Sequence, residues 1–134
     1  MTHALREPAS ELNLLSADVI GAAIEVHRTL GPGLLESAYR ECLCAELELR
    51  RVPYEREVPV ALKYKGRALE CGYRIDLIVN GRLVVELKTV DKLMPIHHAQ
   101  MLTCLRLKRL HLGLLINFNT AALQNGLRRV VNSS

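Results

Sequence analysis

Apolar residues recur at helical spacing in the first third of the chain. Spacings of three and four residues predict a helix over 16–30 and another over 34–50, and Gly31-Pro32-Gly33 between them ends the first helix sharply. The expected apolar faces are Val19, Ala23, Val26 and Leu30 in the first helix and Leu35, Ala38, Cys42, Ala45 and Leu49 in the second. We expect residues 1–15 to form an N-terminal extension ahead of one domain over 16–134.

A period of two then predicts strands near 57–64, 68–79 and 82–90, with a Lys65-Gly66 turn between the first two. Pro95 is expected to open a third helix that runs to about Leu107. HLGLLINF, residues 111–118, reads as a strand buried on both faces beside a parallel neighbour, and GLRRVVN, residues 126–132, as an added edge strand. The order ααβββαβ(β) predicts an α/β (α+β) fold in which helices flank a mixed sheet.

The segment YRIDLIVNGRLVVELKT, residues 73–89, joins two apolar runs through Asn80-Gly81. A two-residue type I′ turn would pair Val79 with Arg82 and point Asp76 and Glu86 to opposite faces. A three-residue loop, Val79-Asn80-Gly81, would instead pair Ile78 with Arg82, with Gly81 as a left-handed bulge residue.

The three-residue loop separates the two faces cleanly. One face is apolar: Tyr73, Ile75, Leu77, Leu83, Val85 and Leu87. The other carries the charges: Arg74, Asp76, Ile78, Arg82, Val84, Glu86 and Lys88. Because a one-residue slip flips every side chain, we prefer this register and expect Asp76 and Glu86 to be diagonal neighbours.

Two carboxylates this close repel each other unless a cation lies between them. Mg²⁺ accepts one or two carboxylates together with water and phosphate oxygens, and Lys88 on the same face could hold or activate an attacking water. These residue types therefore favour phosphodiester hydrolysis. The alternative is a solvated sheet face on which Asp76, Glu86, Lys88 and Arg74 form cross-strand salt bridges.

Asp76 followed by Glu86-Leu87-Lys88 resembles the core of the PD-(D/E)XK nuclease superfamily, and GLLESAY at 33–39 fits the GxxExxY signature of a small prokaryotic family within it. The similarity covers about 20–132 and implies a restriction-endonuclease-like core. It also implies Mg²⁺ (or Mn²⁺) bound by Asp76, Glu86, the Leu87 carbonyl and Glu36, with Lys88 as the catalytic lysine.

The resemblance adds candidates around this centre. Gln100 corresponds to the glutamine of the QxxxY element of RecB-like nucleases, and Cys104 stands where that element has its tyrosine. Gln100 could contact Lys88 or a metal-bound water. The alternative is that Gln100 caps a buried helix edge. Candidate nucleic-acid contacts are Tyr39, His97, His98 and Arg74, with backbone contacts from Arg106, Lys108, Arg109, Arg128 and Arg129. Their alternatives are a core role for Tyr39 and solvated faces for the rest. We expect His27 to be a satisfied core histidine.

Composition narrows the function classes. Eighteen Lys and Arg against 14 Asp and Glu give a net charge of +4, which tolerates a polyanionic partner. No apolar run approaches the ~20 residues of a membrane span, and the first residues do not resemble a secretory signal, so a cytoplasmic protein is expected. Four cysteines without a CxxC predict neither a disulfide framework nor a zinc site.

Two hypotheses follow. The first is a Mg²⁺-dependent nuclease that acts on DNA or RNA through Glu36, Asp76, Glu86 and Lys88. The second is a non-catalytic module that keeps the fold and binds nucleic acid or a protein, or works as a homodimer.

Overall fold

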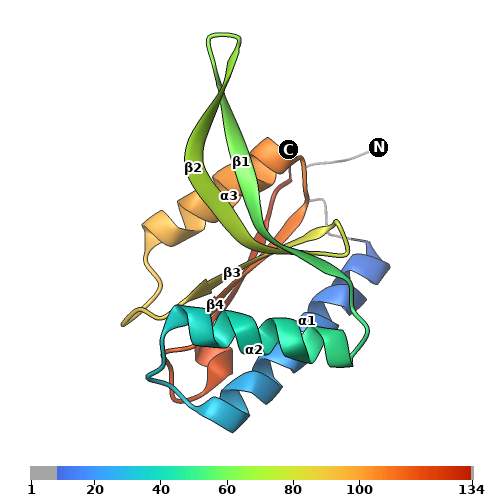
Figure 1. Cartoon of the computed structure of the whole chain (residues 1–134), viewed down its shortest axis with the longest axis vertical. Helices are drawn as coiled ribbons and strands as arrows, with labels where there is room; N and C mark the ends of the chain where they lie inside the picture. Colours follow the sequence, from blue (N-terminus) through green and yellow to red (C-terminus); the bar gives the residue numbers. More distant parts are fainter. Residues whose placement is uncertain (1–8, 134) are drawn as a thin grey trace.

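A five-stranded sheet forms the centre of the molecule, with two helices on one face and one on the other (Figure 1). The structure, a computed structural model, describes residues 9–133. Helices α1 (Ser10–Leu30) and α2 (Glu36–Leu49) cover one face, and α3 (Pro95–Lys108) covers the other. None of the helices in this range is long and apolar enough to cross a membrane.

The strands are β1 (Tyr54–Tyr64), β2 (Arg67–Val79), β3 (Leu83–Lys88), β4 (Leu112–Asn117) and β5 (Leu127–Val131), and they lie in that order across the sheet. Strands β3 and β4 are parallel and the other neighbours are antiparallel. A short 3₁₀ helix, η1 (Leu123–Gly126), precedes β5. The α/β class, the doubly buried parallel strand and the edge strand are thus confirmed.

The helical layer of α1 and α2 differs from the prediction in two respects. Helix α1 begins at Ser10, not at Ser16, and Leu12 is buried; residues 1–8 of the expected extension lie outside the described part of the chain. The predicted face of α2 is wrong, since Leu35 and Leu49 are 76% and 79% exposed. The buried residues are Tyr39, Leu43, Cys44 and Leu47. Tyr39 decides the orientation, because its ring stacks on Phe118 at 4.5 Å between centroids.

Two apolar clusters lie on the two faces of the sheet. Leu77, Leu83, Val85 and Leu87 pack with α1 and α2, as their alternation predicts, and Val79, which was assigned to the loop, packs with them. Ile75 and Tyr73, which were expected on that same face, instead pack under α3 with Ile78 and Val84. The alternation breaks between Ile75 and Leu77, where Glu57 of β1, which lies between their partners Val58 and Arg56, has φ 52° and the backbone pairing of β2 with β3 stops.

The hairpin between β2 and β3 matches neither predicted register. Asn80 and Gly81 both have positive φ, 52° and 66°, and Arg82 N–H closes the turn onto the Val79 carbonyl at 3.0 Å. Pairing then resumes as Val79 with Leu83, which leaves Arg82 as the extra residue. The preferred Ile78–Arg82 pair is therefore wrong. The predicted register nevertheless places the residues of β3 on the correct faces relative to their β2 neighbours, because it differs from the actual one by two residues. The reason for the difference is burial: Val79, assigned to the loop, is fully buried opposite Leu83.

Candidate functional site

Asp76 and Glu86 face each other where the pairing of β2 and β3 gives way to side-chain hydrogen bonds. The last backbone pair before them is Leu77 with Val85. Beyond it, Asp76 N–H donates to Glu86 Oε1 at 3.3 Å, and Leu87 N–H donates to Asp76 Oδ2 at 2.8 Å. The two acids are thus direct cross-strand neighbours, not diagonal ones as predicted. Each carboxylate stands in for a backbone partner, which fixes its position.

Burial makes Glu86 the most perturbed acid of this group. Its side chain is 5% exposed, and burial, followed by the negative charge of Asp76, raises the pKa of Glu86 to about 8. The positive charge of Lys88 acts in the opposite direction. Burial beside a second acid thus favours the protonated form of Glu86. A positive charge beside Glu86 and Asp76 would therefore stabilise the charged forms of both acids.

Glu36 joins the two strand acids from the first turn of α2. Burial and then the charge of Asp76 raise the pKa of Glu36, while Lys88 and Arg40 lower it. The helix N-terminus also favours a carboxylate at this position. Glu36, Asp76, Glu86 and Lys88 are therefore electrostatically coupled, and they come from three different elements of the fold. We call these four residues the acidic centre.

Arg40 is a member of this neighbourhood that the sequence reasoning missed. It lies one turn after Glu36 on α2, and its Nη1 is 3.4 Å from Asp76 Oδ1 and 3.9 Å from Glu36 Oε2. Its Nε is buried and has no hydrogen-bond partner among the described residues. Arg40 thus supplies the positive charge that Asp76 and Glu36 require. An arginine four residues after the GxxExxY glutamate was the available signal.

Lys88 is held in place by the end of β4. It pairs with Asn117, and Phe118 N–H donates to the Lys88 carbonyl at 2.9 Å. Asn117 is 1% exposed, and its amide accepts from Val90 N–H at 3.1 Å and donates to the Val90 carbonyl at 2.9 Å. The backbone on both sides of Thr89 is therefore fixed, and with it the origin of the Lys88 side chain.

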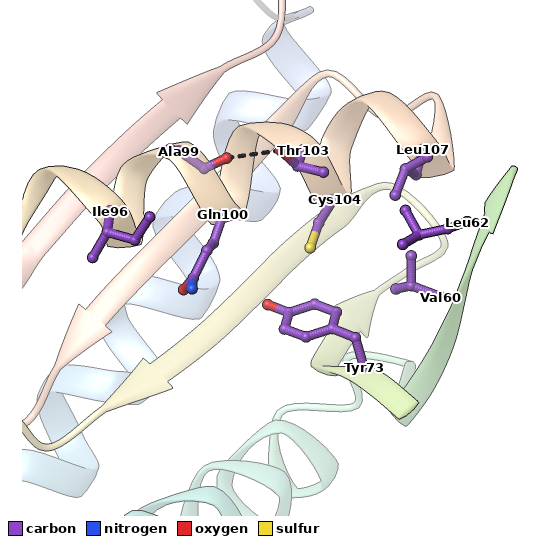
Figure 2. A pocket seen from close by; sticks show the side chains of 9 residues that line it. All are labelled: Val60, Leu62, Tyr73, Ile96, Ala99, Gln100, Thr103, Cys104 and Leu107. Carbon is purple, nitrogen blue, oxygen red and sulfur yellow. Dashed lines mark hydrogen bonds between the residues drawn. The ribbon is translucent and has the colours of Figure 1, made fainter. Parts of the chain in front are cut away.

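Gln100 and Cys104 lie away from the backbone contacts of the acidic centre, beside Tyr73 of β2. Figure 2 shows both side chains on the side of α3 that faces Tyr73, with Cys104 pointing toward the Tyr73 ring, and the three residues line a cavity of about 290 Å³. Burial, the charge of Glu86 and a hydrogen bond with Cys104 raise the pKa of the Tyr73 hydroxyl. A tyrosine from β2 thus stands beside the cysteine that replaces the tyrosine of QxxxY. The acids themselves do not line this cavity.

Two further candidates have structural contacts. Tyr39 is fully buried, and its hydroxyl donates to the Gly31 carbonyl and accepts from Leu34 N–H, so it fastens the Gly-Pro-Gly turn to α2. This burial leaves no ring face on which a base could stack. His27 is 7% exposed and bonds through Nε2 to the Thr120 carbonyl at 2.7 Å, which confirms the satisfied core histidine.

The remaining predicted contacts lie at the surface. His97 Nδ1 accepts from Met94 N–H at 2.8 Å, so His97 caps the start of α3, whereas His98 is exposed. Arg74 is exposed on β2, with Nη1 3.5 Å from the Glu57 carbonyl. Of these three, His98 and Arg74 leave a charged or polar group open to solvent.

The comparison with protein families decides the classification. A model of the PD-(D/E)XK nuclease superfamily matches residues 13–130. The chain belongs to this superfamily. The comparisons with curated proteins and with solved structures gave no match.

Members of the PD-(D/E)XK nuclease superfamily generally use divalent metal ions. The donor chemistry of the acidic centre fits such an ion, because Glu36, Asp76 and Glu86 offer only hard carboxylate oxygens. Burial, and after it the negative charge of Asp76, raises the pKa of Glu86 and of Glu36, so a bound cation would stabilise the charged forms of these acids. Among the side chains that the structure describes, however, no three from His, Cys, Asp or Glu converge closely enough to form a metal cluster.

Proposed function

We propose that this protein is a nuclease of the GxxExxY type, using Mg²⁺ or Mn²⁺ to hydrolyse phosphodiester bonds of nucleic acid. The observation that carries the proposal is the coupling of Glu36, Asp76, Glu86 and Lys88 at one end of the β2–β3 pair. Superfamily membership supports a nuclease-like fold and nucleic acid as the ligand. A cytoplasmic, prokaryotic setting belongs to the same proposal.

The four side chains take distinct roles in this proposal. Asp76, Glu86 and Glu36, with the Leu87 carbonyl, would hold the ion, which when bound supplies charge neutralisation at the phosphate and a more acidic water. Lys88 would orient the attacking water and stabilise negative charge on the phosphate. Asn117 acts through Lys88, because it fixes the backbone from which the lysine projects. Gln100 would position solvent from α3.

Cleavage assays test the proposal directly. Wild-type protein is incubated with plasmid DNA and with labelled single- and double-stranded DNA and RNA, with Mg²⁺, with Mn²⁺ or with chelator. We expect metal-dependent cleavage that Asp76→Ala and Lys88→Ala abolish and that the exposed control Asp18→Ala on α1 retains. Activity equal in all four proteins would indicate a contaminating nuclease and refute the assignment.

A non-catalytic nucleic-acid-binding module is the second candidate. Arg40 favours it, because its guanidinium already lies between Asp76 and Glu36, where an ion would be needed. The absence of a converged ligand set in the described chain points the same way. Binding of nucleic acid without cleavage of any substrate form, with or without metal, would establish this alternative.

A further inference from the structure

The β1–β2 hairpin extends well beyond the body of the molecule. Figure 1 shows its tip at the top, on the side away from α1 and α2. All ten residues from Ala61 to Glu70 are exposed, although they stay paired as a regular antiparallel ribbon up to Tyr64 and Arg67. We call this ten-residue ribbon the arm. Apart from Leu62, which borders the cavity under α3, this ribbon packs against no core and gains little stability by itself, so its projection needs another explanation.

Charge distinguishes the arm from an ordinary exposed hairpin. Lys63, Lys65 and Arg67 lie within five positions of one another, and Glu70 at the base is the arm's single acid. No carboxylate of the described residues forms an ion pair with these three cations. Lys65 Nζ instead lies 5.3 Å from the centre of the Tyr64 ring. The tip thus presents three uncompensated positive charges on a narrow support.

We propose that the arm binds the phosphate backbone of double-stranded nucleic acid while the acidic centre faces another part of the same duplex. This inference rests on the proposed function and deepens it by naming the substrate form. The occupant follows from charge complementarity, since a duplex backbone is a dense line of negative charge and a two-stranded ribbon fits a groove of B-DNA.

The geometry of β2 sets the expected length of the substrate. Arg67 begins this strand and Asp76 lies near its other end, so the two contacts are at most about 30 Å apart, and less where β2 is irregular at Gly72. At about 3.4 Å per base pair, that span corresponds to at most roughly eight or nine base pairs. A stiff duplex keeps its backbone aligned over this distance, whereas a single strand does not. Exposed Arg74 lies between the two contacts and could reach the same backbone.

Binding is measured on full-length protein carrying Asp76→Ala, without metal, so that cleavage does not interfere. The arm variant is Lys63→Gln/Lys65→Gln/Arg67→Gln. The control with equal charge change is Arg28→Gln/Arg50→Gln/Arg51→Gln, at the ends of α1 and α2. Fluorescence anisotropy follows a labelled duplex of about 20 base pairs, a stem-loop of about six base pairs and a single strand of about 20 nucleotides, each as DNA and as RNA.

We expect the arm variant to bind the long duplex about tenfold or more weakly and to lower the salt-dependence slope by about 2–3, since each lost phosphate contact removes about 0.9. The control should keep wild-type affinity, and the short stem-loop should not respond to the arm. The DNA and RNA duplexes, run in parallel, identify which backbone is bound.

Several results would overturn the inference. These are unchanged duplex affinity in the arm variant, an equal loss for the single strand, no duplex binding at low salt, and arm-dependent binding to phosphatidylserine vesicles without duplex binding. A protein that binds duplex through the arm but never cuts would refute the nuclease proposal and leave the inference standing. A protein that cuts with its arm neutralised and its duplex affinity unchanged would do the reverse.

Discussion

The two ends of β2 carry charges under opposite physical conditions. At the inner end, Asp76 is largely covered, touches Arg40 and shares backbone hydrogen bonds with β3. At the outer end, Arg67 and its neighbours on the arm stand in solvent and form no ion pair within residues 9–133. One strand therefore holds both a coupled, partly buried cluster and a solvated basic surface.

The two ends of β2 illustrate two different roles that charged side chains can have. Partly buried charges interact strongly, shift one another's pKa and suit chemistry at a fixed point. Solvated charges are screened by salt and attract a polyanion over its length without fixing any single atom. The same residue type should consequently have different effects at the two ends.

The largest difference should appear when a lysine is replaced at each end. We expect Lys88→Met to lower the cleavage rate by a factor of about 100 or more at any salt concentration, because it removes a group that acts on the reacting atoms. Lys65→Met should lower kcat/KM by only a few-fold, and mainly at higher salt. Single-turnover rates at two salt concentrations measure both effects. Equal, salt-sensitive losses would mean that Lys88 only attracts the substrate.

A second difference concerns stability against pH in the metal-free protein. The pKa of Glu86 rises on folding from its ordinary value of 4.5 to about 8, because the side chain is buried beside Asp76. The folded state therefore keeps a proton that the unfolded chain releases. Stability from this group is complete below about pH 4.5 and is lost as the pH rises toward 8, by up to roughly 4 kcal/mol.

Urea unfolding from about pH 5 to pH 8.5 measures this loss. In Glu86→Gln most of the decline should disappear, with a remainder from Glu36, whose pKa is also raised. The exposed Glu70→Gln on the arm should keep the wild-type profile. A wild-type profile in the Glu86→Gln protein would show that this carboxyl does not titrate as its burial implies.

Arg40 gives a third test, with a smaller effect. In Arg40→Gln, Asp76 and Glu36 lose their positive partner, so the metal-free protein should lose about 1 kcal/mol of stability. Mn²⁺ should bind several-fold more tightly, since it no longer competes with a guanidinium. Calorimetry with Mn²⁺ and urea unfolding measure the two effects. Weaker Mn²⁺ binding in Arg40→Gln would instead show that the guanidinium supports the ion site.

The sequence predicted which side chains share a face at the inner end of β2, because burial sets the alternation of apolar and polar residues along a strand. The grouping of Leu77 with Val85 and the position of Glu86 next to Asp76 both depend on strand parity, which a pattern of apolar residues records. The actual register could not be read in this way. It depends on whether Val79 belongs to the loop or to the core, and the packing of α1 and α2 decides that.

The sequence indicated less about the outer end of β2 and about Arg40, the cation beside the acidic centre. Tyr73 and Ile75 leave the α1–α2 face because the alternation of β2 breaks between Ile75 and Leu77, opposite Glu57 at φ 52°, and no pattern of apolar residues contains that break. Arg40 is a polar residue on a helix, and only the packing of α2 against β2 brings it to Asp76. The basic tip was present in the sequence, but its projection beyond the body depends on the length of the β1–β2 pairing.

The smallest expected effect is that of the arm on folding, and it completes the comparison. Residues 61–70 lie outside both apolar clusters. Replacing Lys63, Lys65 and Arg67 by glutamine should therefore change the free energy of unfolding by no more than about 0.5 kcal/mol, the range for exposed positions. Urea unfolding of this variant and of wild-type protein, both without nucleic acid, measures the change. A loss of several kcal/mol would mean that the three cations hold the ribbon to the body, and their effect on binding would then reflect a displaced arm and not a lost phosphate contact.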